Sequence, residues 1–261
     1  MADRVDFSSA ASTYDRRHGA LIPAEAAEAL VRDASLRLGS RVLDVAAGTG
    51  RVAIPLTALG CRVLAIDIAR PMLEEIPKKA PSLNIPRVIG EGAHLPCASA
   101  AFDAVAIARL LYLVPEWQAL LREAIRVLKP GGRVMHEWSN GDADEEWVQI
   151  REKIRAMFEH QGVANPFHPG VRTEEEVETF LDGLGITRIA TERFGSGHPM
   201  TVGDFLKRLV DGECSYTWAV PKDIAARCLP ELQSWAASRF DLSREVPMPR
   251  EIVWRIYALP E

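Results

Sequence analysis

Short apolar segments alternate with helix-like segments between residues 41 and 138, and this alternation is the feature that most constrains the fold. The predicted strands cover residues 41–45, 62–68, 87–89, 102–107 and 133–138. Alternating strands and helices predict a parallel sheet with helices on both faces. The strands are apolar throughout, as expected when both faces of a sheet are covered. Ligands of such sheets bind where the strands end at their carboxyl termini.

The remaining segments extend the pattern on both sides. Predicted helices cover residues 23–38, 51–59, 71–80, 115–128, 144–161, 173 to 183 or 185, 202–210 and 222–240, with Pro77 a candidate break in the third. Two further strands are predicted over residues 186–193 and 251–258. The sequence has no internal repeat. We therefore expect a single α/β sheet with additional helices.

Charge and cysteine content narrow the function classes. Lys and Arg number 31 against 36 Asp and Glu, a formal net charge of −5. A nucleic-acid surface usually needs a basic surplus, so this composition disfavours nucleic-acid binding. The four cysteines are widely spaced, which indicates free thiols in a reducing compartment. The N-terminus does not resemble a secretory signal and no apolar run is long enough to span a membrane, so a cytoplasmic location is predicted.

The first predicted strand ends in a run of small residues, AAGTG at positions 46–50. Small residues let a backbone pass close to a ligand, and the next helix presents free N–H groups there. Residues 48–53 also match the GxGxxG/A dinucleotide fingerprint. The loop alone therefore leaves a nicotinamide-dependent enzyme open.

Three carboxylates at strand ends help to separate these alternatives. Asp44 lies just before the loop, where it would repel a pyrophosphate and favour a cationic ligand; a buried acid capping loop amides is the alternative. Asp67 can accept both hydroxyls of a ribose, or it can cap the following helix, and it fits either cofactor. Glu91 can accept the exocyclic amine of adenine, and dinucleotide enzymes do not usually place an acid there.

Together, the motifs VLDVAAGTG, AID, GEGAHLP, FDAV and VLKPGGRV occur in this order along the chain. This series resembles the class I S-adenosylmethionine-dependent methyltransferase family, in its small-molecule-like branch, over about residues 8–138. The resemblance implies a Rossmann-like seven-stranded sheet, mostly parallel with an antiparallel last strand, helices on both faces and helical lid or substrate segments. It also implies three regions: an N-terminal helical lid (1–40), an S-adenosylmethionine-binding core (41–139) and substrate-side helices with the last strands (140–261).

The same resemblance implies roles for individual residues. Asp44, Ala46, Gly48 and Gly50 would hold the methionine end, Asp67 the ribose, Ile68 and Met72 the adenine faces, Glu91, Gly92 and Ala93 the adenine edge, and Ala108, Arg109 and Leu110 the floor near the methyl group. Tyr14 would lie near the methionine end, in an N-terminal segment that closes over the cofactor; the alternative is a tyrosine on the surface. The family usually has Gly where Ala46 stands, and we expect binding to survive this small change.

The methyl acceptor is less constrained. His136 and Glu137 are candidate general bases on the fifth strand, on opposite faces; a core His and a paired Glu are the alternative. No metal site is predicted, because the acids at 142–145 fit a helix start better. After the fourth strand, residues 108–111 read ARLL rather than an Asn/Asp-Pro-Pro-Tyr motif, which argues against methylation of amino groups on nucleic-acid bases. Aromatic residues between 140 and 250 favour a small apolar or aromatic acceptor.

Two other functions use the same fold. A non-catalytic protein that binds S-adenosylmethionine or S-adenosylhomocysteine would keep the same cofactor residues. A nicotinamide-dependent oxidoreductase would share the glycine loop, and aminopropyl transfer is a smaller alternative. The oligomeric state is not determined by the sequence.

Overall fold

A computed structural model describes residues 15, 21–141, 145–163, 169–196, 200–211, 214, 217, 220–246 and 250–261. The chain divides into two compact units. The sheet unit comprises Asp6–Ser139, Gly170–Phe194 and Ile252–Glu261, and the helical unit comprises Met1–Val5, Asn140–Pro169 and Gly195–Glu251.

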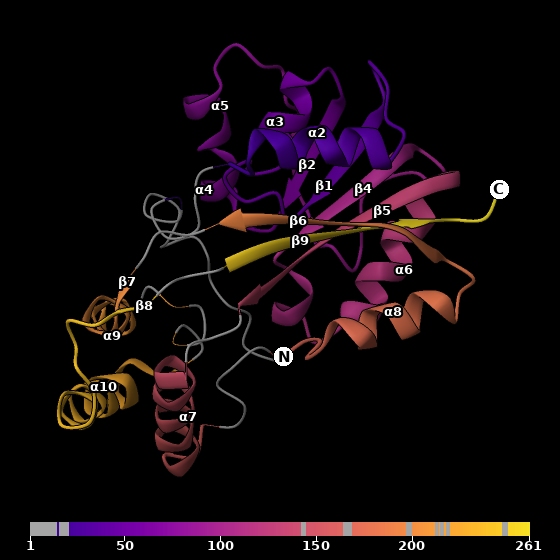
Figure 1. The fold of residues 1–261 in the computed structure, drawn as a ribbon. Helices are drawn as coiled ribbons and strands as arrows, with labels where there is room; N and C mark the ends of the chain where they lie inside the picture. The colour runs from indigo at the N-terminus through magenta and orange to yellow at the C-terminus, as the bar shows by residue number, and fades with distance from the viewer. Residues whose placement is uncertain are drawn as a thin grey trace. The chain divides into compact units, whose positions relative to one another are not determined.

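Seven strands form the sheet, in the order β3-β2-β1-β4-β5-β9-β6. Their bounds are β1 (Arg41–Val45), β2 (Arg62–Asp67), β3 (Arg87–Ile89), β4 (Phe102–Ala108), β5 (Leu128–Gly141), β6 (Thr187–Ser196) and β9 (Arg250–Ala258). The pairs β1–β2, β1–β4, β2–β3 and β4–β5 are parallel, while β9 runs opposite to its neighbours (Figure 1). The predicted seven-stranded sheet with an antiparallel last strand is confirmed.

Helices cover both faces of the sheet (Figure 1). One face carries α2 (Ala24–Asp33), α3 (Ala53–Ala58), α4 (Arg70–Leu73) and α5 (Ile76–Lys79), and the other carries α6 (Trp117–Val127) and α8 (Glu174–Asp182). Alternation along β1 explains this division, because Val42 packs into the core cluster that contains α2 and α3, whereas Leu43 packs into the cluster that contains α6 and α8. A short 3₁₀ helix, η2 (Leu111–Leu113), follows β4.

Some predicted boundaries were wrong, each for a local reason. The helix predicted over residues 71–80 is two short helices, since Pro77 has no N–H to bond the carbonyl four residues earlier. The first described helix ends at Asp33 rather than near residue 38, and Ser35 then takes a positive φ of 55°. The fifth strand begins at Leu128, five residues earlier than predicted, with a register irregularity opposite Phe102 and Ala104.

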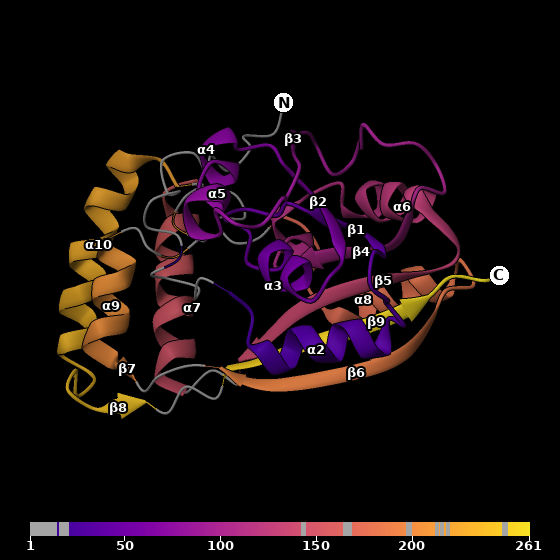
Figure 2. The same cartoon turned by 90° about the horizontal axis from the view of Figure 1, so that it is seen from above.

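The helical unit has its own core. Its helices are α7 (Glu145–His160), α9 (Val202–Val210) and α10 (Lys222–Ala237), and a two-stranded antiparallel sheet joins β7 (Met200–Thr201) to β8 (Glu245–Val246). The three helices lie side by side in both views (Figures 1 and 2). Trp147 of α7 stacks on Phe205 of α9, with ring centroids 4.5 Å apart. None of the helices described here is long and apolar enough to cross a membrane.

Candidate functional site

The loop after β1 is built from left-handed backbone and close packing. Ala46, Gly48 and Gly50 have φ values of 56°, 54° and 86°. A Cβ on Gly50 would lie 3.0 Å from side-chain atoms of both Ile54 and Ile76, so only glycine fits there without displacement. Ala46 does take the conformation that the usual glycine would take more easily, at a cost of about 1–2 kcal/mol.

Asp67, at the end of β2, fixes this loop. Its Oδ2 accepts the N–H of Gly48 at 2.8 Å, and its Oδ1 accepts the N–H of Ala69 at 2.8 Å. Burial raises the pKa of Asp67, and the hydrogen bonds from Ala69 and Gly48 oppose that effect. A carboxylate has about four acceptor positions, so both oxygens can still accept further hydrogen bonds. Capping the next helix and holding a ligand are therefore compatible roles.

Asp44 lies inside the sheet unit, with only 1% of its surface exposed. The N–H of Ala53 donates to its carboxylate, but Oδ2 has no hydrogen-bond partner among the described residues. Burial raises the pKa of Asp44 to about 8; the Ala53 hydrogen bond and the charge on Arg51 oppose this, while the charges on Asp67 and Glu137 add to it. A buried carboxyl oxygen without a hydrogen-bond partner favours a ligand that is cationic or donates a hydrogen bond.

Glu137 joins the glycine loop to the end of β4 through two arginines. Its Oε1 accepts from Nε of Arg109 at 2.8 Å, and its Oε2 accepts from Nη1 of Arg51. The Glu137 side chain has no exposed surface, and both arginine side chains are nine-tenths buried or more. Arg109 also holds a left-handed backbone, with φ 53°. We call Glu137, Arg51 and Arg109 the buried ion triad.

His136 lies on the other face of β5. Burial lowers its pKa to about 3, and the charge on Arg255 lowers it further. Its ring centroid is 6.1 Å from that of Trp138, which in turn lies edge-on to Tyr112 at 6.3 Å. The part of β5 that pairs with the end of β4 thus carries a neutral histidine near aromatic rings on one face and a carboxylate between arginines on the other.

The predicted adenine-binding residues follow β2 and β3. Ile68 has 47% of its surface exposed at the end of β2, while Met72 is buried under the loop, with its Cε 3.3 Å from the position of a Cβ on Gly48. Glu91 and His94 form an isolated antiparallel bridge, so residues 91–94 make a tight turn. Tyr14 lies outside the described residues.

Its neighbour Asp15 is described, and it was not among the predicted site residues. One oxygen of Asp15 accepts from the Thr49 hydroxyl at 2.5 Å, and the other accepts from Nζ of Lys79 at 2.8 Å. The N–H of Ile22 also donates to the carbonyl of Arg51 at 3.1 Å. The only sequence signal for this arrangement is the Tyr-Asp pair at positions 14 and 15, because the partners are distant in sequence.

The structure brings the described candidate residues together at the carboxyl ends of neighbouring strands. These residues lie at the end of or just after β1 (Asp44, Ala46, Gly48, Gly50), β2 (Asp67, Ile68, Met72), β3 (Glu91, Gly92, Ala93) and β4 (Ala108, Arg109, Leu110), and on β5 where it pairs with the end of β4 (His136, Glu137). Within the described part of the chain, no group of three or more metal-ligating side chains occurs. The site therefore offers carboxylates, backbone N–H groups and apolar surface.

Known proteins resemble this chain in sequence mainly over the same region. Residues 43–136 match the family model described as "Methyltransferase domain". The demethylmenaquinone methyltransferase of Corynebacterium efficiens is 40% identical over 99 residues, which are 38% of this chain and 41% of that protein. The chain thus spans about two fifths of the length of this relative.

Solved structures match a larger share of the chain at lower identity. Phosphoethanolamine N-methyltransferase 2 of Haemonchus contortus, in complex with S-adenosyl-L-methionine, is 15% identical with a TM-score of 0.56, over 98% of this chain and 60% of that one. The [4+2]-cyclase SpnF is 16% identical with a TM-score of 0.57, over 91% and 80% of the two chains. These likenesses establish the fold, and the cyclase illustrates that the fold alone does not determine the reaction.

Proposed function

Residues 43–136 form a methyltransferase domain of the class I S-adenosylmethionine-dependent family, and on that premise we propose that the chain transfers a methyl group from S-adenosylmethionine to a small molecule. The observation that carries the proposal is the Asp44 carboxylate, buried beside a loop that only small residues can form. A sulfonium or an ammonium group stabilises the ionised form of this side chain, whereas a pyrophosphate disfavours it, so Asp44 matches a cationic ligand better than an anionic one.

The cofactor fits the described residues from end to end. Asp44, with the backbone of residues 46–50, would hold the methionine end, and Asp67 would accept the ribose hydroxyls. The adenine would cover the exposed side chain of Ile68, and Glu91 with the backbone of Gly92 and Ala93 would bind its edge. Asp67 ends β2 and Glu91 comes soon after β3, and these two strands pair in the same sheet. Because each part of the ligand has a matching group in strand order, the support is cumulative.

When bound, S-adenosylmethionine supplies an electrophilic methyl group, and the chain supplies alignment and exclusion of water. Ala108, Arg109 and Leu110 would form the floor on which the acceptor approaches. Arg109 is held there by Glu137, which fixes the direction of its guanidinium. Positioning therefore accounts for most of what these residues contribute.

The two candidate bases have environments that do not suit a base. Both oxygens of Glu137 accept from arginines, and the side chain is fully buried. His136 is buried and its pKa is about 3, far below the value near neutrality that favours general-base catalysis. We therefore propose that methyl transfer proceeds without a proton acceptor from this pair.

Replacing His136 with asparagine tests that proposal. We expect kcat to change by less than about tenfold, with an unaltered pH profile between pH 6 and 9. Loss of a true general base would instead reduce the rate by about 10²–10⁴. Thermal unfolding of the variant provides the control for folding. If kcat falls 100-fold or more in a folded variant and the acid limb of its pH profile changes, His136 is the general base after all.

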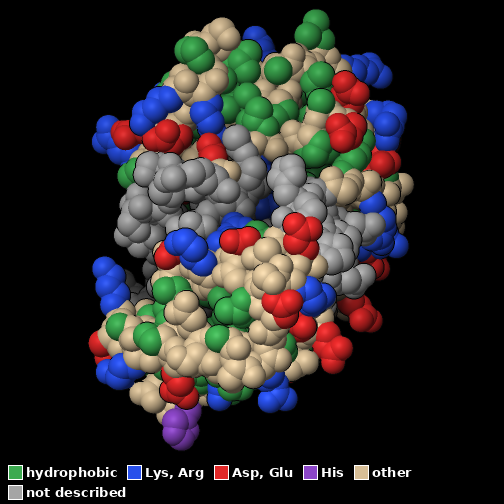
Figure 3. Space-filling model, turned by 60° about the vertical axis from the view of Figure 1, so that its left-hand side comes forward, with side chains coloured by type: hydrophobic (Ala, Val, Ile, Leu, Met, Phe, Trp, Pro, Cys, Tyr) green, Lys and Arg blue, Asp and Glu red, His purple; other side chains and the backbone are tan. Residues whose placement is uncertain are grey.

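The acceptor is proposed to be apolar or aromatic. The ring of Tyr112, in η2 after β4, lies edge-on to that of Trp138 in β5, and the relative from Corynebacterium efficiens is named for a demethylmenaquinone. On the face drawn in Figure 3, acidic and basic side chains are interspersed, which together with the net charge of −5 favours a small molecule over a nucleic acid. We propose a cytoplasmic location.

Binding and transfer are tested separately. Isothermal titration should give a dissociation constant for S-adenosylmethionine between about 1 µM and 1 mM, the range of ordinary enzyme substrates. No binding of NADH is expected. Transfer of a radiolabelled methyl group to a panel of quinols, phenols and other small aromatics should then identify the acceptor class. Binding without transfer to any of them would favour a non-catalytic binding protein, and NADH binding without S-adenosylmethionine binding would contradict the proposal.

A further inference from the structure

One face of α6 contacts the segment that follows β3, at every third position of the helix. A Cβ on Gly92 would lie 2.7 Å from Cδ1 of Leu120, so these two positions are in close contact. Three positions further along α6, Glu123 accepts the N–H of Leu95 at 2.9 Å. After another three positions, Arg126 bonds the same segment. The spacing of three places these side chains along one side of the helix.

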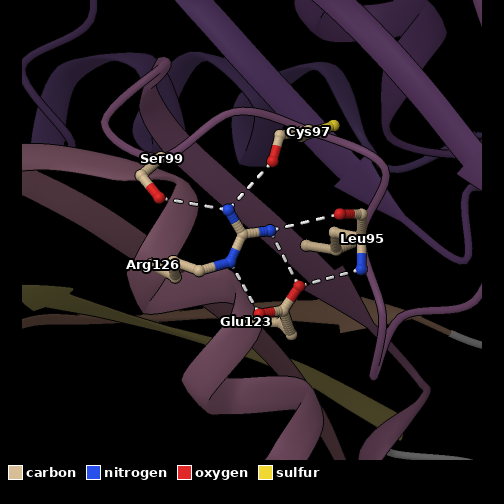
Figure 4. A network of polar contacts seen from close by, with 5 residues as sticks. All are labelled: Leu95, Cys97, Ser99, Glu123 and Arg126. Atoms are coloured by element: carbon tan, nitrogen blue, oxygen red, sulfur yellow. Dashed lines mark hydrogen bonds and ion pairs between the residues drawn. The ribbon is translucent and has the colours of Figure 1, made fainter.

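Arg126 uses all of its hydrogen-bond donors here (Figure 4). Its Nη1 donates to the carbonyl of Cys97 at 2.9 Å and to the hydroxyl of Ser99 at 3.2 Å. Its Nη2 donates to the carbonyl of Leu95 at 3.1 Å and to Glu123 Oε2 at 2.8 Å, and its Nε donates to Glu123 Oε1 at 2.7 Å. These five bonds match the five N–H groups of a guanidinium. We call Arg126 and Glu123, with the backbone they hold, the Arg126 clamp.

The charge on Glu123 is secured by the same contacts. The hydrogen bond from Arg126 lowers the pKa of Glu123, and the N–H of Leu95 lowers it further, against the opposing effect of burial. Glu123 is therefore a carboxylate at neutral pH, with Arg126 bound to both of its oxygens. A bidentate pair of this kind fixes direction as well as distance.

The turn at residues 91–94 is held at both of its ends. On the β3 side, the N–H of Gly90 donates to the carbonyl of Asp67 at 3.0 Å. Within the turn, the N–H of His94 donates to the carbonyl of Glu91 at 3.1 Å. On the other side, the clamp holds both the N–H and the carbonyl of Leu95. A short turn with both ends fixed leaves little freedom to the residues between them.

We propose that Arg126, acting through Glu123, is a positioning residue that sets the selectivity of this protein for adenine. The inference rests on the proposed function, because the turn between the two fixed points carries Glu91, Gly92 and Ala93. All five N–H groups of Arg126 are used in the clamp, so it acts on the turn rather than on the ligand. The methionine end would be held by the loop after β1, whereas the hydrogen bonds of the clamp go to Leu95, Cys97 and Ser99.

Arg126→Met tests the inference by comparing two ligands. S-adenosylhomocysteine carries the exocyclic amine of adenine, and S-inosylhomocysteine has a carbonyl in its place. The wild type should bind S-adenosylhomocysteine more tightly than S-inosylhomocysteine. The ratio of the two dissociation constants should fall about tenfold in Arg126→Met, which corresponds to the loss of one hydrogen bond to a charged group. Isothermal titration measures both constants. In the free protein, hydrogen exchange at the Leu95 amide should be faster.

Matched variants separate positioning from general damage. Arg122→Met removes an arginine one turn earlier on α6, whose guanidinium lies over the Phe180 ring at 5.1 Å, and it should leave the ligand ratio unchanged. Arg126→Lys should lose most of the ratio, because three donors cannot replace a planar five-donor group. Should Arg126→Met fail to fold by circular dichroism, Arg126→Lys and Glu123→Gln carry the same comparison.

Two results would overturn the inference. One is a ratio in the Arg126 variants equal to that of Arg122→Met. The other is an equal loss of affinity for both ligands, which would make the clamp merely structural. A wild-type protein that binds neither ligand would instead overturn the proposed function, and the inference with it, so the two failures are distinguishable.

Discussion

Replacing Glu137 with alanine is expected to lower the free energy of unfolding of the sheet unit by about 3–5 kcal/mol. The side chain of Glu137 is fully buried and bonds Arg51 and Arg109, which are almost fully buried themselves. Removing the carboxylate leaves two guanidinium groups without their shared counter-charge in a region of low polarity. Removing one partner of a buried ion pair is costly for this reason, even where the intact pair adds little to stability.

Native-state hydrogen exchange of the β1 and β4 amides measures this loss, because these central strands open only with the sheet unit. Glu74→Ala is the matched control. Glu74 pairs with Arg70 on the surface, where both side chains are more than half exposed, so its removal should cost less than about 1 kcal/mol. Glu137→Gln should fall between the two, since it keeps the shape and loses the charge. A cost below 1 kcal/mol for Glu137→Ala would contradict the assignment of the triad.

The triad also illustrates what the sequence could not predict. Alternation placed His136 and Glu137 on opposite faces of one strand, which is a local property. The partners of Glu137 are 86 and 28 residues away. No local pattern indicates which of 31 basic residues reaches a given carboxylate, so pairing followed only from the packed fold. Asp15 is a second example, with its partners 34 and 64 residues away.

Elements with local signals were predicted closely. The helix over residues 202–210 was predicted with both of its ends, and Thr201 and Asp204 form a capping box at its start. The strand over residues 41–45 agrees in the same way. By contrast, β7 and β8 have two residues each, too few to show a period, and were not predicted. The strand-end carboxylates Asp44 and Asp67 were located correctly because parallel strands end at a common edge.

The second large effect concerns pH. Burial raises the pKa of Asp44 to about 8, so below that pH the free protein holds Asp44 mainly as the neutral acid. A ligand with a sulfonium charge favours the carboxylate and therefore lowers this pKa, which means that binding releases a proton. By linkage, the affinity for S-adenosylmethionine should rise with pH up to about 8, by as much as about tenfold per pH unit.

Stability changes in the opposite direction. Asp44 binds its proton more tightly in the folded protein than in the unfolded chain, where its pKa is near 3.8. Between about pH 4 and pH 8, the folded state therefore holds more protons at this group than the unfolded state. The contribution of Asp44 to the free energy of unfolding falls as pH rises through that window. Asp44→Asn removes this dependence.

Titrations at pH 6, 7 and 8 test the binding effect, with a total gain of up to about 100-fold over two pH units. Asp44→Asn is the control, because it keeps the shape of the side chain, cannot ionise, and reports any titration of the ligand's own amino group. S-adenosylhomocysteine lacks the sulfonium charge, so its affinity should depend less steeply on pH. An equal slope in the wild type and Asp44→Asn would show that Asp44 does not meet the cation. The sulfonium would be located beside Asp44 if, in the wild type but not in Asp44→Asn, affinity rises less steeply with pH for S-adenosylhomocysteine than for S-adenosylmethionine. The sulfonium charge is what distinguishes the two ligands here, so only a charge-dependent contact with Asp44 gives this difference.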